Sequence, residues 1–270
     1  MLKISWRIYA VLILSALGGL AKIIGGIFYG SKAIFVDALT SLANLVAAYA
    51  TIYYYKVSQK PPDIDHHYGH YKLGFGGALV SLAAYSFVAG LVIVELYRVE
   101  PYIVSINATF FAIAGFIFYC LAIMLAKREG EFFTPYSVFT VSELIESIVV
   151  ILASLVGALY NYIVDYIGAL ILAAYIFVEI FSTGRDLLRN LSDIAPSTKF
   201  ILNVKETIEE NGFTVVDIKI RKIHSNLWHG DLLLKPSRKD ELDKLSERVK
   251  KLKEELMKKH RLDATVELIE

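Results

Sequence analysis

Hydrophobic residues fill six long, nearly uninterrupted stretches in the first 196 residues of the chain. Each stretch has about 20 or more residues, which at ~1.5 Å of rise per residue spans a hydrocarbon core of ~30 Å. Because backbone polar groups find no water partners in lipid, a helix is the expected structure of each stretch. The pattern predicts an all-α domain of six transmembrane helices over residues 1–196, at 8–29, 33–55, 73–97, 102–126, 136–160 and 163–182.

The pattern changes after residue 196, where shorter amphipathic segments replace the apolar runs. Val216, Ile218 and Ile220 alternate with polar residues, which predicts a strand that buries this apolar side. Apolar residues at helical spacing predict a helix on either side of the first two strands. The order αββαβ indicates a small α+β domain over residues 197–270, with one three-stranded sheet covered by two helices. The expected elements are a helix at 198–211, strands near 216–220 and 228–234, a helix at 242–256 and a strand at 266–268.

Composition agrees with this division into a membrane domain and a soluble domain. The mean hydropathy is +0.51 and 56% of the residues are hydrophobic. Charged residues number 25 in the first 196 positions and 30 in the last 74. Such an apolar first part excludes a soluble globular enzyme.

Charge and motifs exclude several function classes. The net charge of +1 argues against binding nucleic acid through a phosphate-neutralising surface. The single cysteine, Cys120, excludes an internal disulfide framework and a CxxC metal site. Neither a P-loop, a GxSxG elbow nor an HExxH motif is present, so we expect that the protein is not an enzyme.

Positive residues flanking the apolar stretches predict the orientation of the chain. Lysine and arginine gather at the amino terminus, in the even-numbered loops and on the carboxyl side of the last stretch. Only Lys32 and Arg98 fall on the opposite side. The positive-inside rule therefore predicts a multi-pass protein of the cell membrane with both termini, and the soluble domain, in the cytoplasm.

Ionisable residues inside the apolar stretches are functional candidates, because a charge at membrane depth is costly unless it is paired or hydrated. Glu95 and Asp165 lie near the ends of stretches, where an interfacial role is the simplest interpretation. Lys22 and Glu179 are expected either to pair with each other or to extend toward the membrane surface. The full set is Lys22, Asp37, Glu95, Glu143, Glu146, Asp165 and Glu179.

Two of the stretches carry polar residues on one helix face. Asp37, Thr40 and Asn44 are spaced i, i+3 and i+7, and the fifth stretch repeats this kind of spacing at Phe139, Glu143 and Glu146. Facing stripes of this kind would give oxygen ligands to a cation. The alternative is interhelical hydrogen bonding by threonine and asparagine around a carboxyl group that stays protonated.

The loop after the second stretch concentrates possible metal ligands. Its sequence Asp63-Ile64-Asp65-His66-His67-Tyr68-Gly69-His70 holds three of the six histidines beside two carboxylates. Imidazole and carboxylate together suit Zn²⁺, Mn²⁺, Fe²⁺ or Co²⁺. The alternative is an ordinary polar loop.

These features together resemble the cation diffusion facilitator family over essentially the whole chain. The loop sequence His66-His67-Tyr68-Gly69-His70-Tyr71-Lys72 is similar to the family's H-x-[FY]-G-H-x-K and is the most specific match. The other matching segments occur in order at family-like spacing. They are Gly30-Ser31, the stretch from Asp37 to Asn44, Glu143 with Ser147 and Val150, the stretch from Asp165 to Ala169, and Asp193.

The resemblance implies a homodimer in the lipid bilayer that exports divalent metal ions in exchange for protons by alternating access. It implies six transmembrane helices followed by a metallochaperone-like αββαβ domain. The family's transport-site positions fall at Thr40, Asn44, Phe139 and Glu143, and the phenylalanine cannot bind a metal. Asp37 or Glu146 is expected to complete the site.

An all-oxygen site favours a harder ion such as Mn²⁺ or Mg²⁺ over Zn²⁺, although the transported substrate, Zn²⁺, Mn²⁺, Fe²⁺ or Mg²⁺, stays undecided. Metal binding is expected to displace a proton from a buried carboxylate. The changed ligands also fit an alternative, a non-transporting homologue that senses metal or regulates a partner.

The resemblance assigns roles to further residues outside the apolar stretches. Asp63, His66 and His70 match a second, cytoplasm-facing metal site of some members, and Lys72 with Asp193 matches a structural charge pair at the waist of the dimer. In the soluble domain, Asp217, Asp231 and Glu267 stand near positions where other members have metal-binding histidines. Of the remaining histidines, His224 and His229 are expected to be exposed polar residues and His260 a cation that caps the last helix.

Overall fold

The computed structural model describes residues 6–127, 134–224, 227–238 and 241–269, although the side chains of residues 8, 134–142 and 224 lie outside this description. Two compact units emerge. One comprises Met1–Lys56 and Phe75–Arg185, and the other comprises Val57–Gly74 and Asp186–Glu270. The loop after the second helix therefore clusters with the carboxyl-terminal part of the chain.

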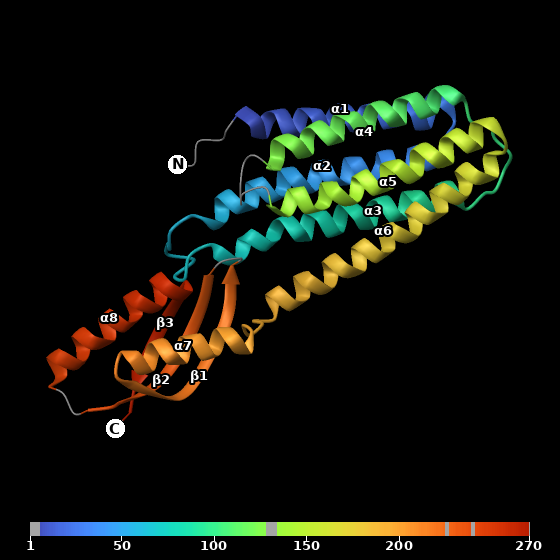
Figure 1. Cartoon of the computed structure of the whole chain (residues 1–270). Coiled ribbons are helices and arrows are strands. Elements are labelled where there is room, and N and C mark those ends of the chain that lie inside the picture. The colour runs from blue at the N-terminus through green and yellow to red at the C-terminus, as the bar shows by residue number, and fades with distance from the viewer. Residues whose placement is uncertain (1–5, 128–133, 225–226, 239–240, 270) are drawn as a thin grey trace. The chain divides into compact units, whose positions relative to one another are not determined.

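Six long helices, running side by side in Figure 1, make up the first unit and confirm the predicted all-α architecture. Among the described residues, five helices (α1, α2, α3, α4 and α6) are long and apolar enough to cross a membrane. The predicted boundaries hold within a few residues except at the end of α6, which continues past the apolar stretch. The helices are α1 Trp6–Tyr29, α2 Lys32–Ser58, α3 Gly76–Leu96, α4 Ile106–Ala126, α5 Thr134–Leu159 and α6 Tyr162–Leu191.

Small residues let these helices approach one another closely. A Cβ atom on Gly26 of α1 would lie 2.7 Å from the backbone nitrogen of Phe35 in α2. Similarly, a Cβ on Gly168 of α6 would clash with the Cβ of Ala153 in α5. Helices in lipid associate through this kind of close van der Waals packing, because the hydrophobic effect gives no preference for helix over lipid. Substitution of either glycine would separate the helices that carry the polar core.

The first turn of α2 is capped by a residue from α6. Asp165 is fully buried, and its Oδ2 accepts the N–H of Lys32 at 2.8 Å and the N–H of Ala33 at 3.4 Å. Its Oδ1 accepts the hydroxyl of Ser31. A carboxylate here satisfies amide groups that have no partner within their own helix and complements the helix dipole. Asp165 thereby joins the starts of α2 and α6.

The carboxyl-terminal part of the second unit has the predicted αββαβ order (Figure 1). The sheet order is β1-β2-β3, with β1 antiparallel and β3 parallel to the central strand. Helices α7 and α8 contact each other and the sheet around one apolar core, which includes Ile208, Phe213, Leu234 and Leu256. The elements are α7 Thr198–Glu210, β1 Phe213–His224, β2 Leu227–Pro236, α8 Leu242–His260 and β3 Leu262–Leu268.

The inward face predicted for β1 is wrong at Val216, because the strand contains a bulge there. The pairing with β2 shifts register between Val215 and Asp217, and the side chain of Val216 is 50% exposed. Ile220 is buried as predicted, while Phe213 and Val215, not Val216, face the core before the bulge. An extra residue moves the alternation by one position, because side chains in a strand change sides at every residue.

Two histidine predictions are also corrected. His229 in β2 is buried rather than exposed, with a ring nitrogen 3.5 Å from each of Asp231 and Asp263. His260 at the end of α8 lies 2.8 Å from the hydroxyl of Thr207. Burial, with a smaller contribution from the nearby Lys259 ammonium, lowers the pKa of His260, so this site favours the neutral ring over the expected cation. His224 lies outside the described side chains.

Candidate functional site

A buried hydrogen bond joins the two helices that were predicted to carry the transport site. The Nδ2 of Asn44 in α2 donates to Oε1 of Glu143 in α5. Glu143 is 1% exposed, and its other oxygen, Oε2, has no hydrogen-bond partner among the described residues. The two polar stripes therefore face each other inside the bundle, which leaves an acceptor atom available to a ligand.

Glu146 lies one turn further along α5 and is also buried. Asp37, Glu143 and Glu179 are the acidic groups that act on it electrostatically. Burying several carboxylates together is unfavourable unless cations or protons compensate their charge. This region of the bundle therefore has the charge that a divalent cation requires.

Asp37 already has a protein partner. The Nζ of Lys22 in α1 donates to Asp37 Oδ1 at 2.8 Å and to Ser41 Oγ at 3.1 Å, and both charged side chains are buried. The expected alternatives for Lys22, pairing with Glu179 or extension toward the membrane surface, are both wrong. The lysine instead lies with Asp37, and its ammonium sits 4.4 Å from the ring centroid of Tyr119.

Thr40 is buried, but its hydroxyl is directed to its own helix. Its Oγ1 donates to the carbonyl oxygen of Asp37 at 2.9 Å. The hydroxyl retains lone pairs that can accept or coordinate. Phe139, the fourth position implied by the family resemblance, lies outside the described side chains.

Tyr85 of α3 is part of this polar core, although the sequence pattern did not single it out. Its hydroxyl donates to Oδ1 of Asn44, and its side chain is 4% exposed. The carboxyl group of Glu179 in α6 also acts on the Tyr85 phenol. The only sequence signal for Tyr85 was a phenol in a largely apolar helix. A tyrosine hydroxyl buried in such a place usually has a hydrogen-bond partner.

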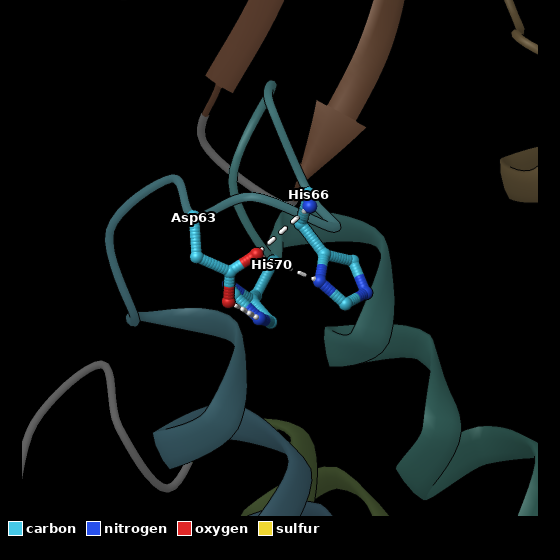
Figure 2. Close-up of side chains that lie close together, drawn as sticks. All are labelled: Asp63, His66 and His70. Atoms are coloured by element: carbon cyan, nitrogen blue, oxygen red, sulfur yellow. Dashed lines mark hydrogen bonds and ion pairs between the residues drawn. The ribbon is translucent and has the colours of Figure 1, made fainter.

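The second candidate site is the loop between α2 and α3 (Figure 2). His66 Nδ1 lies 3.1 Å from Asp63 Oδ1, and His70 Nε2 lies 3.2 Å from Asp63 Oδ2. One ligand atom from each residue can be chosen so that all three lie within 4.8 Å of one another. Within the described ranges, no other group of three histidine, cysteine or acidic side chains meets this criterion.

Local hydrogen bonds build this trio. Asp63 Oδ1 accepts the backbone N–H of Asp65 at 3.1 Å and of His66 at 2.8 Å. Gly69, at φ 81°, takes the left-handed conformation that returns the chain toward His70. Desolvation is the largest single effect on Asp63 and raises its pKa, but the hydrogen bonds from His66 and Asp65 and the nearby His70 together outweigh it and hold this pKa below its usual value.

The chemistry of the trio fits a bound metal ion. His70 is buried, and the structure gives its Nδ1 no hydrogen-bond partner within the part of the chain that it describes. Two imidazoles and a carboxylate are the donor set of many Zn²⁺ and Mn²⁺ sites. A fourth ligand from water would complete a tetrahedral shell.

A charge cluster links this loop to the segment after α6. Lys72 Nζ lies 3.1 Å from Asp193 Oδ1, and Arg221 Nη1 lies 3.4 Å from Asp193 Oδ2. The hydrogen bond from Lys72 and the positive charges of both partners hold the pKa of Asp193 below its usual value. Asp193 itself adopts a left-handed conformation at φ 55°. The family resemblance pointed to the Lys72–Asp193 pair, whereas Arg221 comes from the tertiary structure alone.

The acidic positions of the sheet do not gather into a comparable group. Asp217 accepts the N–H of Ile218 at 2.8 Å and lies near Lys219, while Asp231 lies against His229. Each ring nitrogen of His229 faces a different carboxylate. This geometry suits a buried histidine bridging two strands rather than a common metal ion. Glu267 stands on β3, opposite Leu233 of β2.

Comparison with known proteins gives a consistent result. The family model described as the cation efflux transmembrane domain matches residues 8–192. The manganese efflux system protein MneS of Bacillus subtilis is 40% identical over 65 residues, which are 24% of this chain and 21% of MneS. An uncharacterized transporter of Methanocaldococcus jannaschii is 28% identical over 234 residues, which are 76% of this chain and 75% of the relative.

A third relative is named for a different metal. The zinc transporter ZitB of Pectobacterium atrosepticum is 27% identical over 131 residues, covering 47% of this chain and 41% of ZitB. The chain thus matches about a fifth of the length of MneS and less than half the length of ZitB. The name of MneS refers to manganese and that of ZitB to zinc.

Proposed function

Because the chain belongs to the cation diffusion facilitator family of multi-pass metal transporters, we propose that it exports a divalent metal ion from the cytoplasm in exchange for protons. The observation that carries this proposal is the buried contact between Asn44 and Glu143. It brings an amide and a carboxylate from two helices to one point inside a bundle of apolar helices.

Metal would bind where the oxygen atoms of this contact can turn toward it. Glu143 offers the unpartnered Oε2, and Asn44 offers Oδ1 once the amide is released from its present partners. Glu146 supplies a second carboxylate nearby. Asp37 neutralises Lys22 and would act at a distance.

Proton exchange follows from the cost of uncompensated charge. A carboxylate in an apolar bundle needs either a proton or a cation, so arrival of the metal favours departure of a proton. With no histidine in the predicted spans, the carboxylates have to carry this exchange. Rocking of the helices would then open the site to the opposite side of the membrane.

Manganese is the substrate that we propose first. The described ligands in the bundle are oxygen atoms, which suit Mn²⁺ and Mg²⁺ better than Zn²⁺. MneS is named for manganese, as is MneP of the same bacterium, which is 33% identical over 99 residues. A competition assay with Mn²⁺, Mg²⁺, Fe²⁺ and Zn²⁺ in proteoliposomes would rank the ions.

The direct test uses Glu143→Gln in proteoliposomes with a pH-sensitive dye inside. This change removes the proton-exchanging carboxyl but keeps the size of the side chain, so metal-driven proton flux should disappear. Glu95→Gln is the matched control, since Glu95 is 43% exposed at the end of α3 and should leave the flux unchanged. Flux in the Glu143 variant equal to that of the parent would reject the proposal.

A sensor that binds metal without moving it is the second candidate. The observation that favours it is the loop trio, whose ligand atoms already lie close together. Among the described residues of the bundle, no comparable group of three ligands is assembled. The flux assay separates the two functions, because a sensor would bind metal at Asp63, His66 and His70 yet carry no current of metal or protons.

A further inference from the structure

Both polar atoms of the Asn44 amide have a hydrogen-bond partner in the present conformation. Its Nδ2 donates to Glu143, and its Oδ1 accepts the hydroxyl of Tyr85. Oδ1 is the atom that a metal ion would coordinate, because the lone pair of the amide nitrogen is delocalised into the carbonyl group. The tyrosine hydroxyl therefore uses one of the two lone pairs of Oδ1 and competes with a metal ion for this atom.

A second acceptor close to Tyr85 comes from another helix. Glu179 of α6 lies at the same hydroxyl, and a carboxyl group accepts hydrogen bonds whether or not it is ionised. A phenol has only one hydrogen to donate, so Tyr85 cannot donate to Asn44 and Glu179 at the same time. Its ring is 4% exposed and packed in the apolar core, so only the O–H needs to rotate.

We propose that Tyr85 is a positioning residue that releases Asn44 to the metal by turning its hydroxyl from Asn44 Oδ1 to Glu179. The inference rests on the proposed transport function and extends its site from α2 and α5 to α3 and α6. In the metal-free site the hydroxyl holds the amide with Nδ2 toward Glu143. When metal takes Oδ1, the hydroxyl hydrogen bonds to Glu179, so no buried polar group is left without a partner.

The exchange explains why a half-buried carboxylate lies beside a buried phenol. Without Glu179, metal binding would leave the Tyr85 hydroxyl unpaired in an apolar core, which is the costly outcome for a buried donor. With Glu179, one hydrogen bond replaces another and the net cost of freeing Asn44 is small. Glu179 thus acts through Tyr85 and needs no contact with the metal.

The test is a suppression experiment on Mn²⁺ transport by the full chain in proteoliposomes. Glu179→Met removes the alternative acceptor, so Tyr85 stays on Asn44 and the KM for Mn²⁺ should rise about tenfold with kcat little changed. Glu179→Gln keeps an acceptor oxygen and should remain within about threefold of the parent.

The decisive variant combines Tyr85→Phe with Glu179→Met. The competing hydroxyl is gone, so the double variant should regain most of the affinity that Glu179→Met lost. Tyr166→Phe with Glu179→Met is the matched control and should not recover, because the Tyr166 hydroxyl donates to the carbonyl oxygen of Leu96 at 2.7 Å. If Tyr85 and Glu179 have only a structural role, the second substitution should instead raise the KM further.

The outcomes separate this inference from the proposed function. If the parent transports Mn²⁺ but the double variant has a KM as high as that of Glu179→Met or higher, the switch is overturned. The proposed transport function is not affected by that result. The switch is overturned in the same way if Glu179→Met has the KM of the parent. A parent that moves no metal of the tested panel overturns both the switch and the transport function. Recovery with Tyr85→Phe and Glu179→Met, but not with Tyr166→Phe and Glu179→Met, supports both.

Discussion

Lys22 sits deep among the helices of the first unit, where an unpaired ammonium would be very costly. Asp37 neutralises it, Ser41 accepts a second hydrogen bond, and the face of the Tyr119 ring lies against it. Gly115 leaves space for its stem, since a Cβ there would lie 2.9 Å from the Cγ of Lys22. These contacts make Asp37 a counter-ion first, and only secondarily a candidate for the metal site.

Removal of the counter-ion should therefore damage stability. Asp37→Asn leaves the ammonium of Lys22 buried without an opposing charge, and we expect the free energy of unfolding to fall by about 3–5 kcal/mol. Denaturant unfolding of the purified protein in detergent micelles measures this loss. The combination of Lys22→Met with Asp37→Leu removes both charges and should recover most of it. An Asp37→Asn protein that keeps its stability but no longer binds metal would show instead that Asp37 is a ligand.

The histidine trio depends on residues that can be changed one at a time. His66→Ala and His70→Ala should each lower the amount of bound Zn²⁺ or Mn²⁺ by about one ion per chain, because a site with two remaining ligands binds weakly. Equilibrium dialysis followed by elemental analysis gives the stoichiometry. His67→Ala is the control, since this exposed histidine lies between the two others and outside the trio. Equal metal content in all four proteins would exclude the loop as a metal site.

At the scale of elements, the contact between α7 and α8 contains a histidine whose pKa is shifted by its surroundings. His260 Nε2 lies 2.8 Å from Thr207 Oγ1, and the pKa of His260 is lowered by burial first and by Lys259 second, with Glu255 acting in the opposite direction. A histidine with a lower pKa in the folded state than in the unfolded chain binds protons more readily when unfolded. Its stabilising contribution is complete above the unfolded pKa of about 6.5 and declines as pH falls through the folded pKa.

The stability of the carboxyl-terminal αββαβ part should therefore decline between about pH 7 and pH 5, partly through His260. His260→Gln keeps a polar group near Thr207 but does not titrate, so its unfolding midpoint should depend less on pH over this window. Thermal unfolding of the full chain, followed at several pH values, makes the comparison. A variant whose pH dependence matches that of the parent would assign the decline to other groups.

The bulge in β1 shows how an element can be predicted correctly while its face is not. Alternation of apolar residues located the strand, and Ile220 is buried as the pattern requires. The extra residue near Val216 shifts which side faces the core before it. A bulge depends on pairing with the neighbouring strand, so the sequence of one strand does not determine it.

At the scale of the whole molecule, the orientation in the membrane can be tested because the chain has one cysteine. Cys120→Ser gives a background without thiols. A cysteine introduced by Lys60→Cys, in the loop after α2, should react with an impermeant maleimide only after cells are permeabilised. A cysteine introduced by Tyr160→Cys, between α5 and α6, should react in intact cells, since both positions replace exposed side chains. Reversed labelling would contradict the orientation predicted from lysine and arginine.

The sequence by itself determined the six long helices, the αββαβ order and the choice of candidate residues for the two metal sites, because hydrophobic period and motif spacing are local properties of the chain. Only the tertiary structure decided which side chains meet across the sequence. It paired Lys22 with Asp37, Tyr85 with Asn44, and Arg221 with Asp193, and it buried His229. A buried polar group takes whichever partner the packing of distant segments brings within hydrogen-bonding distance, and the pattern of a single helix or strand carries no information about that distance.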